Sequence, residues 1–204
     1  MRNSIMTCNI IWLESVDSTN SEIRRRIENL DDLTVISARN QTEGRGQNGN
    51  KWFSQHGQSL TFSIVLKQIA LRAWEQAAIS EAVALAIVDT LDSYGIKAWI
   101  KWPNDIYCGD KKICGILIEN SLMGEQIRWS IIGIGLNVNQ TNFPTDLPNP
   151  TSMKLCTGCE YQIEDILVSL TSRITKSYND FLQSPGHEPE LRERYLCRSG
   201  FDNR

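Results

Sequence analysis

The chain has 204 residues, of which 41% are hydrophobic and 22% are charged, a balance that fits one globular domain with a small appendage. Its 21 lysines and arginines against 24 aspartates and glutamates give a formal net charge of -3. This charge balance excludes the global basic field that drives non-specific nucleic-acid binding, so any phosphate site must be local.

The N-terminal segment, residues 1–14, contains a short apolar patch that Asn9 interrupts, and no small-residue cleavage site follows it. We interpret this segment as a first strand rather than a targeting signal. The longest apolar run near the middle of the chain, at 83–88, is far below the ~18 residues that a membrane-spanning helix needs. We therefore expect a soluble protein that makes no membrane contact.

The six cysteines are scattered along the chain, and without a secretion signal this pattern favours reduced thiols in the cytoplasm over a disulfide framework. Cys156 and Cys159 form a lone CxxC motif, which is a spacing found in zinc and redox sites. No second pair accompanies it, and the only histidines are His56 and His187. A metal or redox function of this motif is therefore disfavoured.

The first helix is predicted at residues 20–30, where Thr19 followed by Glu22 resembles a capping box and apolar residues then repeat at helical spacing. The arginine run at 24–26 falls within this helix. We interpret the run as a solvated helix face in preference to a site for an acidic partner. A short strand is predicted next, at 35–38.

The remaining elements follow from periodicity and from breaker residues. We expect a glycine-rich loop at 40–58, a strand at 59–66, a helix at 73–93 that Gly95 ends, a strand at 97–102 that Pro103 closes, a hairpin of 112–120 and 126–139 that turns at Met123-Gly124, a connection at 140–160 and a helix at 163–182. No strand pattern remains beyond residue 182. This order of elements predicts an α+β domain with a mixed sheet flanked by helices.

One loop with potential chemistry is the segment 42–52, TEGRGQNGNKW. Its glycines let the backbone approach a ligand closely, its exposed amides can form an anion-binding nest, and Arg45 adds a planar fork suited to carboxylate or phosphate. The string is neither a P-loop nor a dinucleotide-binding GxGxxG motif. A flexible surface loop explains the same composition equally well.

A second polar segment, KWPNDIYCGDKKICGILIEN, occupies residues 101–120. Asn104 and Asp105 stand where a strand stops, and a carboxylate there could hold a metal or orient a polar ligand group. Two lysines follow before the next strand, and strand alternation would turn one of them, Lys111 or Lys112, toward the sheet face. The alternative is a charged turn with a solvated lysine pair.

A third segment, IIGIGLNVN, places Gly133 and Gly135 in a strand, with Asn137 at the next alternate position. Glycine lowers strand stability but permits close approach of a ligand or of another backbone. A tightly packed core strand is the alternative interpretation.

Together, GRGQNGNKW at 44–52, KWPNDIY and KKICGILIE within 101–119, and GIGLNVN at 133–139 closely resemble the biotin protein ligases, or biotin–acetyl-CoA-carboxylase ligases. DSTN at 17–20 and TS at 151–152 match the same family, so the likeness covers nearly the whole chain in the right order. Lipoate ligases share the superfamily, but they resemble the glycine-rich loop much less and lack the KWPND string.

The resemblance implies a catalytic domain of the class II aminoacyl-tRNA synthetase-like, biotin/lipoate ligase type over residues 1–184. It also implies that 185–204 is an extension leading to a small β-barrel domain absent from this chain. The implied reaction has two steps. Biotin and ATP with Mg²⁺ form biotinyl-5′-adenylate and pyrophosphate, and a lysine of a biotin carboxyl carrier protein then attacks the mixed anhydride.

The family's motifs also imply roles for individual residues. The biotin site would comprise Ser18, Thr19, Asn20, Gln41, Gly44, Arg45, Gly46, Lys112 and Gly115. The nucleotide would contact Gln47, Trp52, Asn104 and Asn137. The catalytic residues would be Lys112, Arg45 and Asp105, with Lys112 holding the biotin carboxylate and phosphate oxygens and Asp105 also implied as the Mg²⁺ ligand.

Two departures from the family pattern shape these expectations. Many members carry an arginine where this chain has Gln47, and a neutral amide cannot supply that charge, so adenylate retention or loop ordering is expected to differ. No helix-turn-helix precedes the ligase motifs, which disfavours DNA binding, whereas relatives often dimerise through exposed sheet edges. The alternatives are a biotin- or adenylate-binding module with impaired transfer because the C-terminal domain is missing, and a lipoate ligase.

Overall fold

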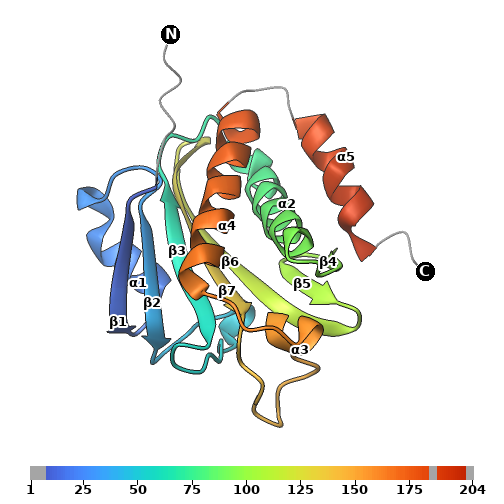
Figure 1. Cartoon of the computed structure of the whole chain (residues 1–204). Coiled ribbons are helices and arrows are strands. Elements are labelled where there is room, and N and C mark those ends of the chain that lie inside the picture. The colour runs from blue at the N-terminus through green and yellow to red at the C-terminus, as the bar shows by residue number, and fades with distance from the viewer. Residues whose placement is uncertain (1–7, 184–187, 201–204) are drawn as a thin grey trace.

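The computed structural model describes residues 8–183 and 188–200, which are built around a seven-stranded sheet in the order β1-β2-β3-β7-β6-β5-β4 (Figure 1). The strands are β1 (Ile10–Val16), β2 (Val35–Gln41), β3 (Ser59–Leu66), β4 (Ala98–Lys101), β5 (Asp105–Cys108), β6 (Lys111–Met123) and β7 (Gln126–Asn137). β1 and β2 run parallel, and all other neighbours are antiparallel. The predicted α+β domain with a mixed sheet is confirmed.

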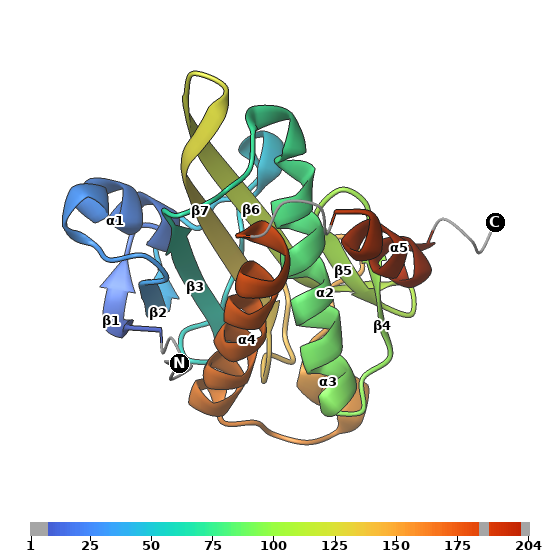
Figure 2. The same cartoon turned by 90° about the horizontal axis from the view of Figure 1, so that it is seen from above.

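In the part of the chain that the structure describes, five α-helices flank the sheet: α1 (Thr19–Arg26), α2 (Ala77–Ser93), α3 (Met153–Thr157), α4 (Ile163–Ser177) and α5 (Glu188–Arg198). Helices α2 and α4 lie side by side over one face of the sheet, and α5 packs beside α2 (Figures 1 and 2). Within the described ranges, no helix is long and apolar enough to cross a membrane.

Strand alternation divides the apolar residues between the two faces of the sheet. On β3, Ile64 belongs to the large core between the sheet and α2 and α4, whereas Val65 belongs to a smaller cluster that includes Ile23 of α1. β2 makes the same division, with Val35 in the large core and Ile36 in the small cluster. Helix α1 therefore covers the face of the sheet opposite α2 and α4.

The α1 face of the central strands carries small and polar residues where α1 does not cover it. Ser63 of β3 pairs with Gly133 of β7, and Gly133 pairs in turn with Leu117 of β6. Two residues further along β7 and on the same face, Gly135 lies between its partners Thr61 and Gly115. The two glycines leave a shallow floor in the middle of the sheet, on which side chains from elsewhere can lie.

Two elements differ from the sequence-based prediction because short or sparse patterns hid them. Residues 105–108 were expected to be a polar loop but form strand β5, and residues 153–157 form α3 within the expected connection. β5 pairs with both β4 and β6, which satisfies its backbone despite its four-residue length. Helix α3 is a single turn whose N-cap, Ser152, accepts a hydrogen bond from the Leu155 amide.

The C-terminal helix α5 was not predicted either. Over residues 189–198, where burial is described, this helix buries Leu191 and Tyr195 alone, a stripe too thin to stand out in the sequence. Ion pairs to the acidic side chains of α2 hold the rest of it, including Arg194 with Asp89 at 3.3 Å. Surface ion pairs leave no hydrophobic periodicity, so tertiary contacts decide the formation of this helix.

The predicted capping box at the start of α1 is wrong. The N-cap is Ser18, whose side chain makes no capping hydrogen bond. Thr19 instead lies within hydrogen-bond distance of Gln41 on β2, and Glu22 pairs with arginines of α1. The polar side chains at this helix start are therefore used to join α1 to the sheet.

Candidate active site

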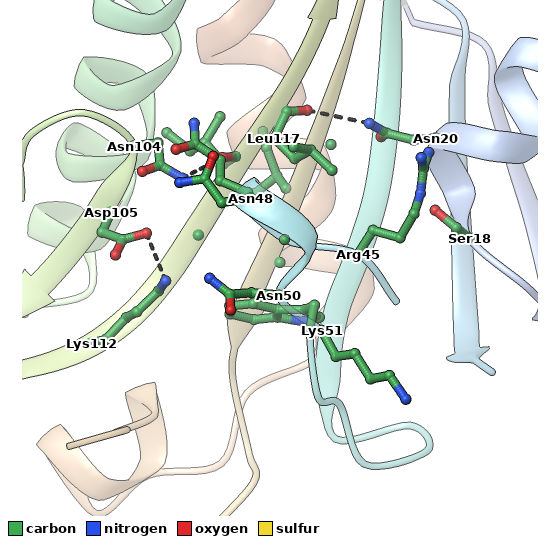
Figure 3. Close-up of a pocket in the computed structure, with 18 of the residues that line it drawn as sticks. Ser18, Asn20, Arg45, Asn48, Asn50, Lys51, Asn104, Asp105, Lys112 and Leu117 are labelled. Carbon is green, nitrogen blue, oxygen red and sulfur yellow. Dashed lines mark hydrogen bonds and ion pairs between the residues drawn. The ribbon is translucent and has the colours of Figure 1, made fainter. Parts of the chain in front are cut away.

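A cavity of about 540 Å³ opens on the α1 face of the sheet, within the usual size range of ligand pockets (Figure 3). Its walls come from the start of α1, the glycine-rich loop, the 102–105 turn and the small-residue floor of β6 and β7. The structure brings together twelve of the residues that the sequence singled out: Ser18, Thr19, Asn20, Gln41, Arg45, Gly46, Gln47, Trp52, Asn104, Asp105, Lys112 and Gly115.

Lys112 reaches the cavity because β6 contains a bulge. Ile106 of β5 pairs with Cys114, but the next residue, Tyr107, pairs with Lys112, so Ile113 is an extra residue in β6. An extra residue reverses the alternation locally, which places Lys112 on the same face as Gly115. The bulge therefore aims Lys112 into the cavity, while Lys111 is exposed.

Lys112 and Asp105 form the principal charged pair of the cavity. Nζ of Lys112 lies 2.7 Å from Oδ1 of Asp105, in an ion pair rather than an aligned hydrogen bond (Figure 3). The same Nζ lies 5.8 Å from the centroid of the Trp52 ring. Both charged side chains are partly buried, at 32% and 23% exposed, so water screens their charges less than it screens a fully exposed pair.

Trp52 lies on the floor of the cavity. A Cβ atom at Gly135 would stand 2.3 Å from the indole, and one at Gly115 would stand 3.0 Å from it. The group that lies close to these two glycines is therefore the indole of the chain's own Trp52. Within the described part of the chain, the indole Nε1 is buried and has no hydrogen-bond partner, so a ligand acceptor could satisfy it.

The glycine-rich loop folds back on itself, which brings Trp52 over the sheet. The Trp52 amide donates to the Gly44 carbonyl at 2.9 Å, and the backbones of Arg45 and Lys51 form an isolated antiparallel β-bridge. A Cβ at Gly44 would come within 2.5 Å of the Trp52 carbonyl, so Gly44 is required by the loop's own backbone. Gly44 does not line the cavity.

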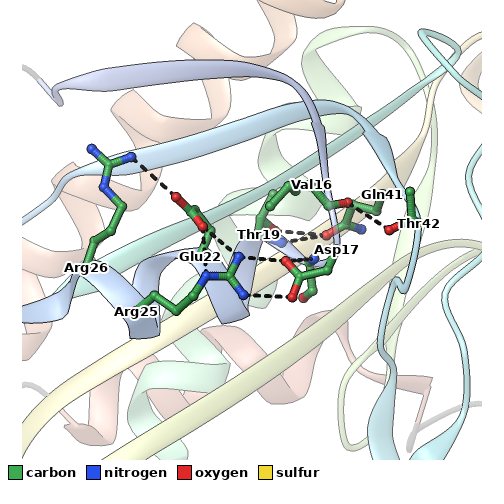
Figure 4. A network of polar contacts seen from close by, with 9 residues as sticks. Val16, Asp17, Thr19, Glu22, Arg25, Arg26, Gln41 and Thr42 are labelled. Atoms are coloured by element: carbon green, nitrogen blue, oxygen red, sulfur yellow. Dashed lines mark hydrogen bonds and ion pairs between the residues drawn. The ribbon is translucent and has the colours of Figure 1, made fainter.

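The DSTN segment, residues 17–20 at the start of α1, is held by a network of polar contacts (Figure 4). Both terminal nitrogens of Arg25 donate to Asp17, at 2.8 and 2.7 Å, and this guanidinium holds the pKa of the Asp17 carboxyl well below its usual range. On the other side of this segment, the Thr19 amide donates to Gln41 at 2.8 Å. The arginine run is thus exposed, as predicted, and paired within its own chain.

Asn20 lies at the junction between the cavity wall and the loop. Its Nδ2 donates to the Leu117 carbonyl at 3.3 Å and to Oε2 of Glu119 at 2.9 Å. Arg45 of the glycine-rich loop donates to the same Glu119 oxygen at 3.3 Å. Sequence reasoning missed Glu119, although its position two residues beyond Leu117 and four beyond Gly115 places it on the same strand face.

Asn137 does not line the cavity, in contrast to its expected contact with the nucleotide. It is buried, and its Nδ2 donates to the Thr151 carbonyl at 2.9 Å, which ties β7 to the segment before α3. The structure adds lining residues that the sequence did not single out, namely Asn48, Asn50, Lys51, Trp102 and Leu117. Loop asparagines and an exposed tryptophan carry no pattern that distinguishes them from surface residues.

The cysteines take no part in this cavity. All six thiols are free, and Cys156 and Cys159 of the CxxC motif are exposed. Residues 8–183 and 188–200 contain no group of three or more histidine, cysteine or acidic side chains that could hold a metal ion.

Comparison with known proteins identifies the family and the fold of the chain. A model of the biotin/lipoate A/B protein ligase family matches residues 12–137, which is more than half of the chain. The chain therefore belongs to this family.

Two curated relatives are similar over most of this chain. The bifunctional ligase/repressor BirA of Bacillus subtilis is 31% identical over 187 residues, covering 89% of this chain. The biotin–protein ligase of Homo sapiens is 33% identical over 184 residues, covering 82% of this chain. The chain spans 57% of the length of the bacterial relative and 24% of the human one.

A solved structure gives the same result in three dimensions. The biotin protein ligase from Aquifex aeolicus in complex with biotin and ATP superimposes with a TM-score of 0.82 and 29% sequence identity. The match covers 95% of this chain and 79% of the Aquifex chain. The mixed sheet and its flanking helices are thus those of a biotin protein ligase catalytic domain.

Proposed function

We propose that this chain activates biotin with ATP to form biotinyl-5′-AMP and then transfers biotin to a lysine of a biotin carboxyl carrier protein. The observation that carries the proposal is the position of Lys112, which a bulge aims into the cavity beside Asp105 and the Trp52 ring. The likeness to the Aquifex enzyme, whose structure contains biotin and ATP, supports the same assignment.

In the first step, a biotin carboxylate oxygen attacks the α-phosphorus of ATP, and the bond to the pyrophosphate oxygen breaks. Two anions must approach each other for this step, and negative charge builds up on the phosphate oxygens. A fixed ammonium in a water-poor cavity stabilises such charge much more strongly than it would in bulk water. Lys112 supplies this ammonium, and Asp105 holds it in place through the 2.7 Å contact.

In the second step, the neutral amine of a carrier lysine attacks the acyl carbon of the adenylate, AMP leaves, and the amine loses a proton. The anhydride must be shielded from water until the carrier arrives. The glycine-rich loop is placed to shield it, because Arg45, Gly46 and Gln47 line the cavity directly. Arg45 carries the charge suited to the phosphate.

The Mg²⁺ that accompanies ATP fits this site only as an ion held mainly by the nucleotide. Asp105 is the one acidic side chain among the residues that line the cavity. Mg²⁺ commonly binds through one or two carboxylates together with substrate phosphates and water, so a single aspartate suffices. Bound there, Mg²⁺ would neutralise phosphate charge, and Asp105 would be its protein ligand.

The test is incubation of the chain with biotin, ATP, Mg²⁺ and a purified biotin carboxyl carrier domain. We expect biotinyl-5′-AMP to form and the carrier to gain one biotin, measured by intact mass. Adenylate formation without carrier labelling would instead favour the biotin- and adenylate-binding module. This distinction matters because the chain spans only part of its curated relatives.

A lipoate ligase is separated from a biotin ligase by calorimetric titration with the two acids. Heat from biotin and none from lipoate is the expected result, and binding of lipoate alone would overturn the assignment. The proposal further includes a homodimer joined at a sheet edge, for which β1 and β4 are the edge strands. A cytoplasmic location is supported by the six free cysteines, because free thiols are typical of reducing compartments.

A further inference from the structure

Glu119 is a partly buried carboxylate at the junction between the cavity and α1. Its side chain is 20% exposed, and it lies on the cavity face of β6 without being part of the cavity lining. Oε1 forms an ion pair with Arg24 of α1 at 2.8 Å, and Oε2 accepts hydrogen bonds from Asn20 and Arg45. One carboxylate therefore contacts the wall of the cavity and its glycine-rich loop at the same time.

The contact with Glu119 fixes the orientation of the Asn20 amide. A carboxylate can only accept hydrogen bonds, so the amide nitrogen of Asn20 must face Glu119. The amide oxygen then points the other way, 2.5 Å from the Ser63 hydroxyl and against Gly133, where a Cβ would stand 2.3 Å from it. The Asn20 side chain is thus held from both sides.

The contact with Arg45 is of a different kind. At 3.3 Å and with 39% of the Arg45 side chain exposed, it is a weak, solvent-screened ion pair. When an anion enters the cavity, Arg45 can leave Glu119 and form a stronger ion pair with that anion. Glu119 therefore holds Asn20 firmly and keeps Arg45 close to the cavity with a contact that can be released.

We propose that Glu119 is a positioning residue that couples the cavity wall at Asn20, where biotin would bind, to the glycine-rich loop. A single Glu119 oxygen orients Asn20 and anchors Arg45. The identity of biotin as the ligand rests on the proposed function. Glu119 acts through its two partners and touches no reacting atom.

The test uses the charge-neutral variant Glu119→Gln, the shorter acid Glu119→Asp and the matched control Arg24→Gln. Arg24→Gln removes the other partner of the same carboxylate, on α1 and away from the cavity lining. The first readout is the rate of trypsin cleavage after Arg45 and Lys51 without ligand, which reports loop anchoring. The second is KM for biotin and for ATP in adenylate formation.

We expect Glu119→Gln to speed loop cleavage and to raise KM for biotin about tenfold, because a neutral amide oxygen accepts a weaker hydrogen bond from Asn20 and forms no ion pair with Arg45. KM for ATP should stay within about twofold, Arg24→Gln should leave every value within about twofold, and Glu119→Asp should fall between the wild type and Glu119→Gln. A purely structural glutamate would lower stability in Glu119→Gln and Arg24→Gln alike, without this split between biotin and ATP.

Unchanged loop cleavage and unchanged KM for biotin in Glu119→Gln would overturn the coupling. So would an equal effect of Arg24→Gln. Failure of the proposed function is a separate result, because the unmodified chain would then form no adenylate while the ligand-free cleavage comparison still reports on Glu119.

Discussion

The indole of Trp52 lies directly on the backbone of Gly135, so closely that a Cβ at residue 135 would come within 2.3 Å of the ring. The glycine-rich loop and the GIGLNVN strand therefore meet at one contact, between residues that are 83 positions apart in the sequence. This contact explains why β7, in the middle of the sheet, contains a glycine at position 135 although glycine weakens a strand.

Gly135→Ala is expected to destabilise the fold by about 1–3 kcal/mol, the usual cost of inserting a methyl group into a packed site. Biotin binding should fall with it, since the indole must leave the floor of the cavity. Urea denaturation and calorimetry measure the two effects. In the double variant with Trp52→Leu, removal of the indole should restore most of the stability. A stable Gly135→Ala variant that binds biotin normally would refute this account of the floor.

Lys112→Ala is expected to lower adenylate formation by more than about 100-fold, because a fixed cation aimed at developing charge is lost. The fold should persist, since the side chain is 32% exposed and belongs to neither hydrophobic cluster. Lys111→Ala is the matched control, because Lys111 is exposed and the bulge turns it away from the cavity. Single-turnover measurements compare the two variants. Equal losses in both, or none in Lys112→Ala, would remove Lys112 from the mechanism.

Gln47→Arg is expected to slow release of the adenylate by about tenfold, because a guanidinium forms charge-assisted hydrogen bonds to phosphate that a neutral amide cannot form. Gln47 lines the cavity beside Gly46, so the longer side chain can reach an occupant. Rapid filtration of biotinyl-5′-AMP from the loaded chain gives the rate. Gln47→Lys is a useful comparison, since it adds charge without the planar fork. Release from Gln47→Arg at the wild-type rate would show that residue 47 does not contact the adenylate.

Asp17→Asn is expected to destabilise the chain at neutral pH, with an effect that shrinks in acid. Arg25 lowers the pKa of Asp17 in the folded state, so the stabilisation is complete above the unfolded-state pKa and is lost as the pH falls toward the folded pKa. The difference in urea midpoint between wild type and Asp17→Asn should therefore begin to shrink below about pH 4. A difference that stays constant down to about pH 2.5 would contradict this role of the ion pair.

The elements with strong periodicity could be predicted from the sequence. The hairpin of β6 and β7 turns at Gly124, which has φ of 61°, and α2 ends at Ser93 as expected. The helix predicted at 163–182 is α4 up to Ser177 and then a π-helical turn at Tyr178–Leu182. β5 and α5 could not be predicted, because their formation depends on partners distant in the sequence. β5 is paired by strands on both sides, and α5 is held by ion pairs to α2.

In the candidate site, too, features carried by local sequence motifs could be predicted, and features set by contacts between distant residues could not. The motifs around Arg45, Asp105 and Lys112 carry enough local pattern to be found, and the structure gathers them around one cavity. The bulge at Ile113 that aims Lys112, and the carboxylate of Glu119 that joins Asn20 to Arg45, depend on register between strands and on tertiary contacts. The residue order places Glu119 on the strand face of Gly115 and Leu117, but it does not reveal the contacts of Glu119 or the bulge at Ile113.

The central claim is that this cavity activates biotin with ATP, and biotin-dependent exchange of pyrophosphate into ATP measures that step most directly. The account predicts exchange that requires biotin and Mg²⁺, proceeds without a carrier protein and disappears in Lys112→Ala but not in Lys111→Ala. Exchange that is absent from the folded wild-type chain at saturating biotin and ATP would contradict it.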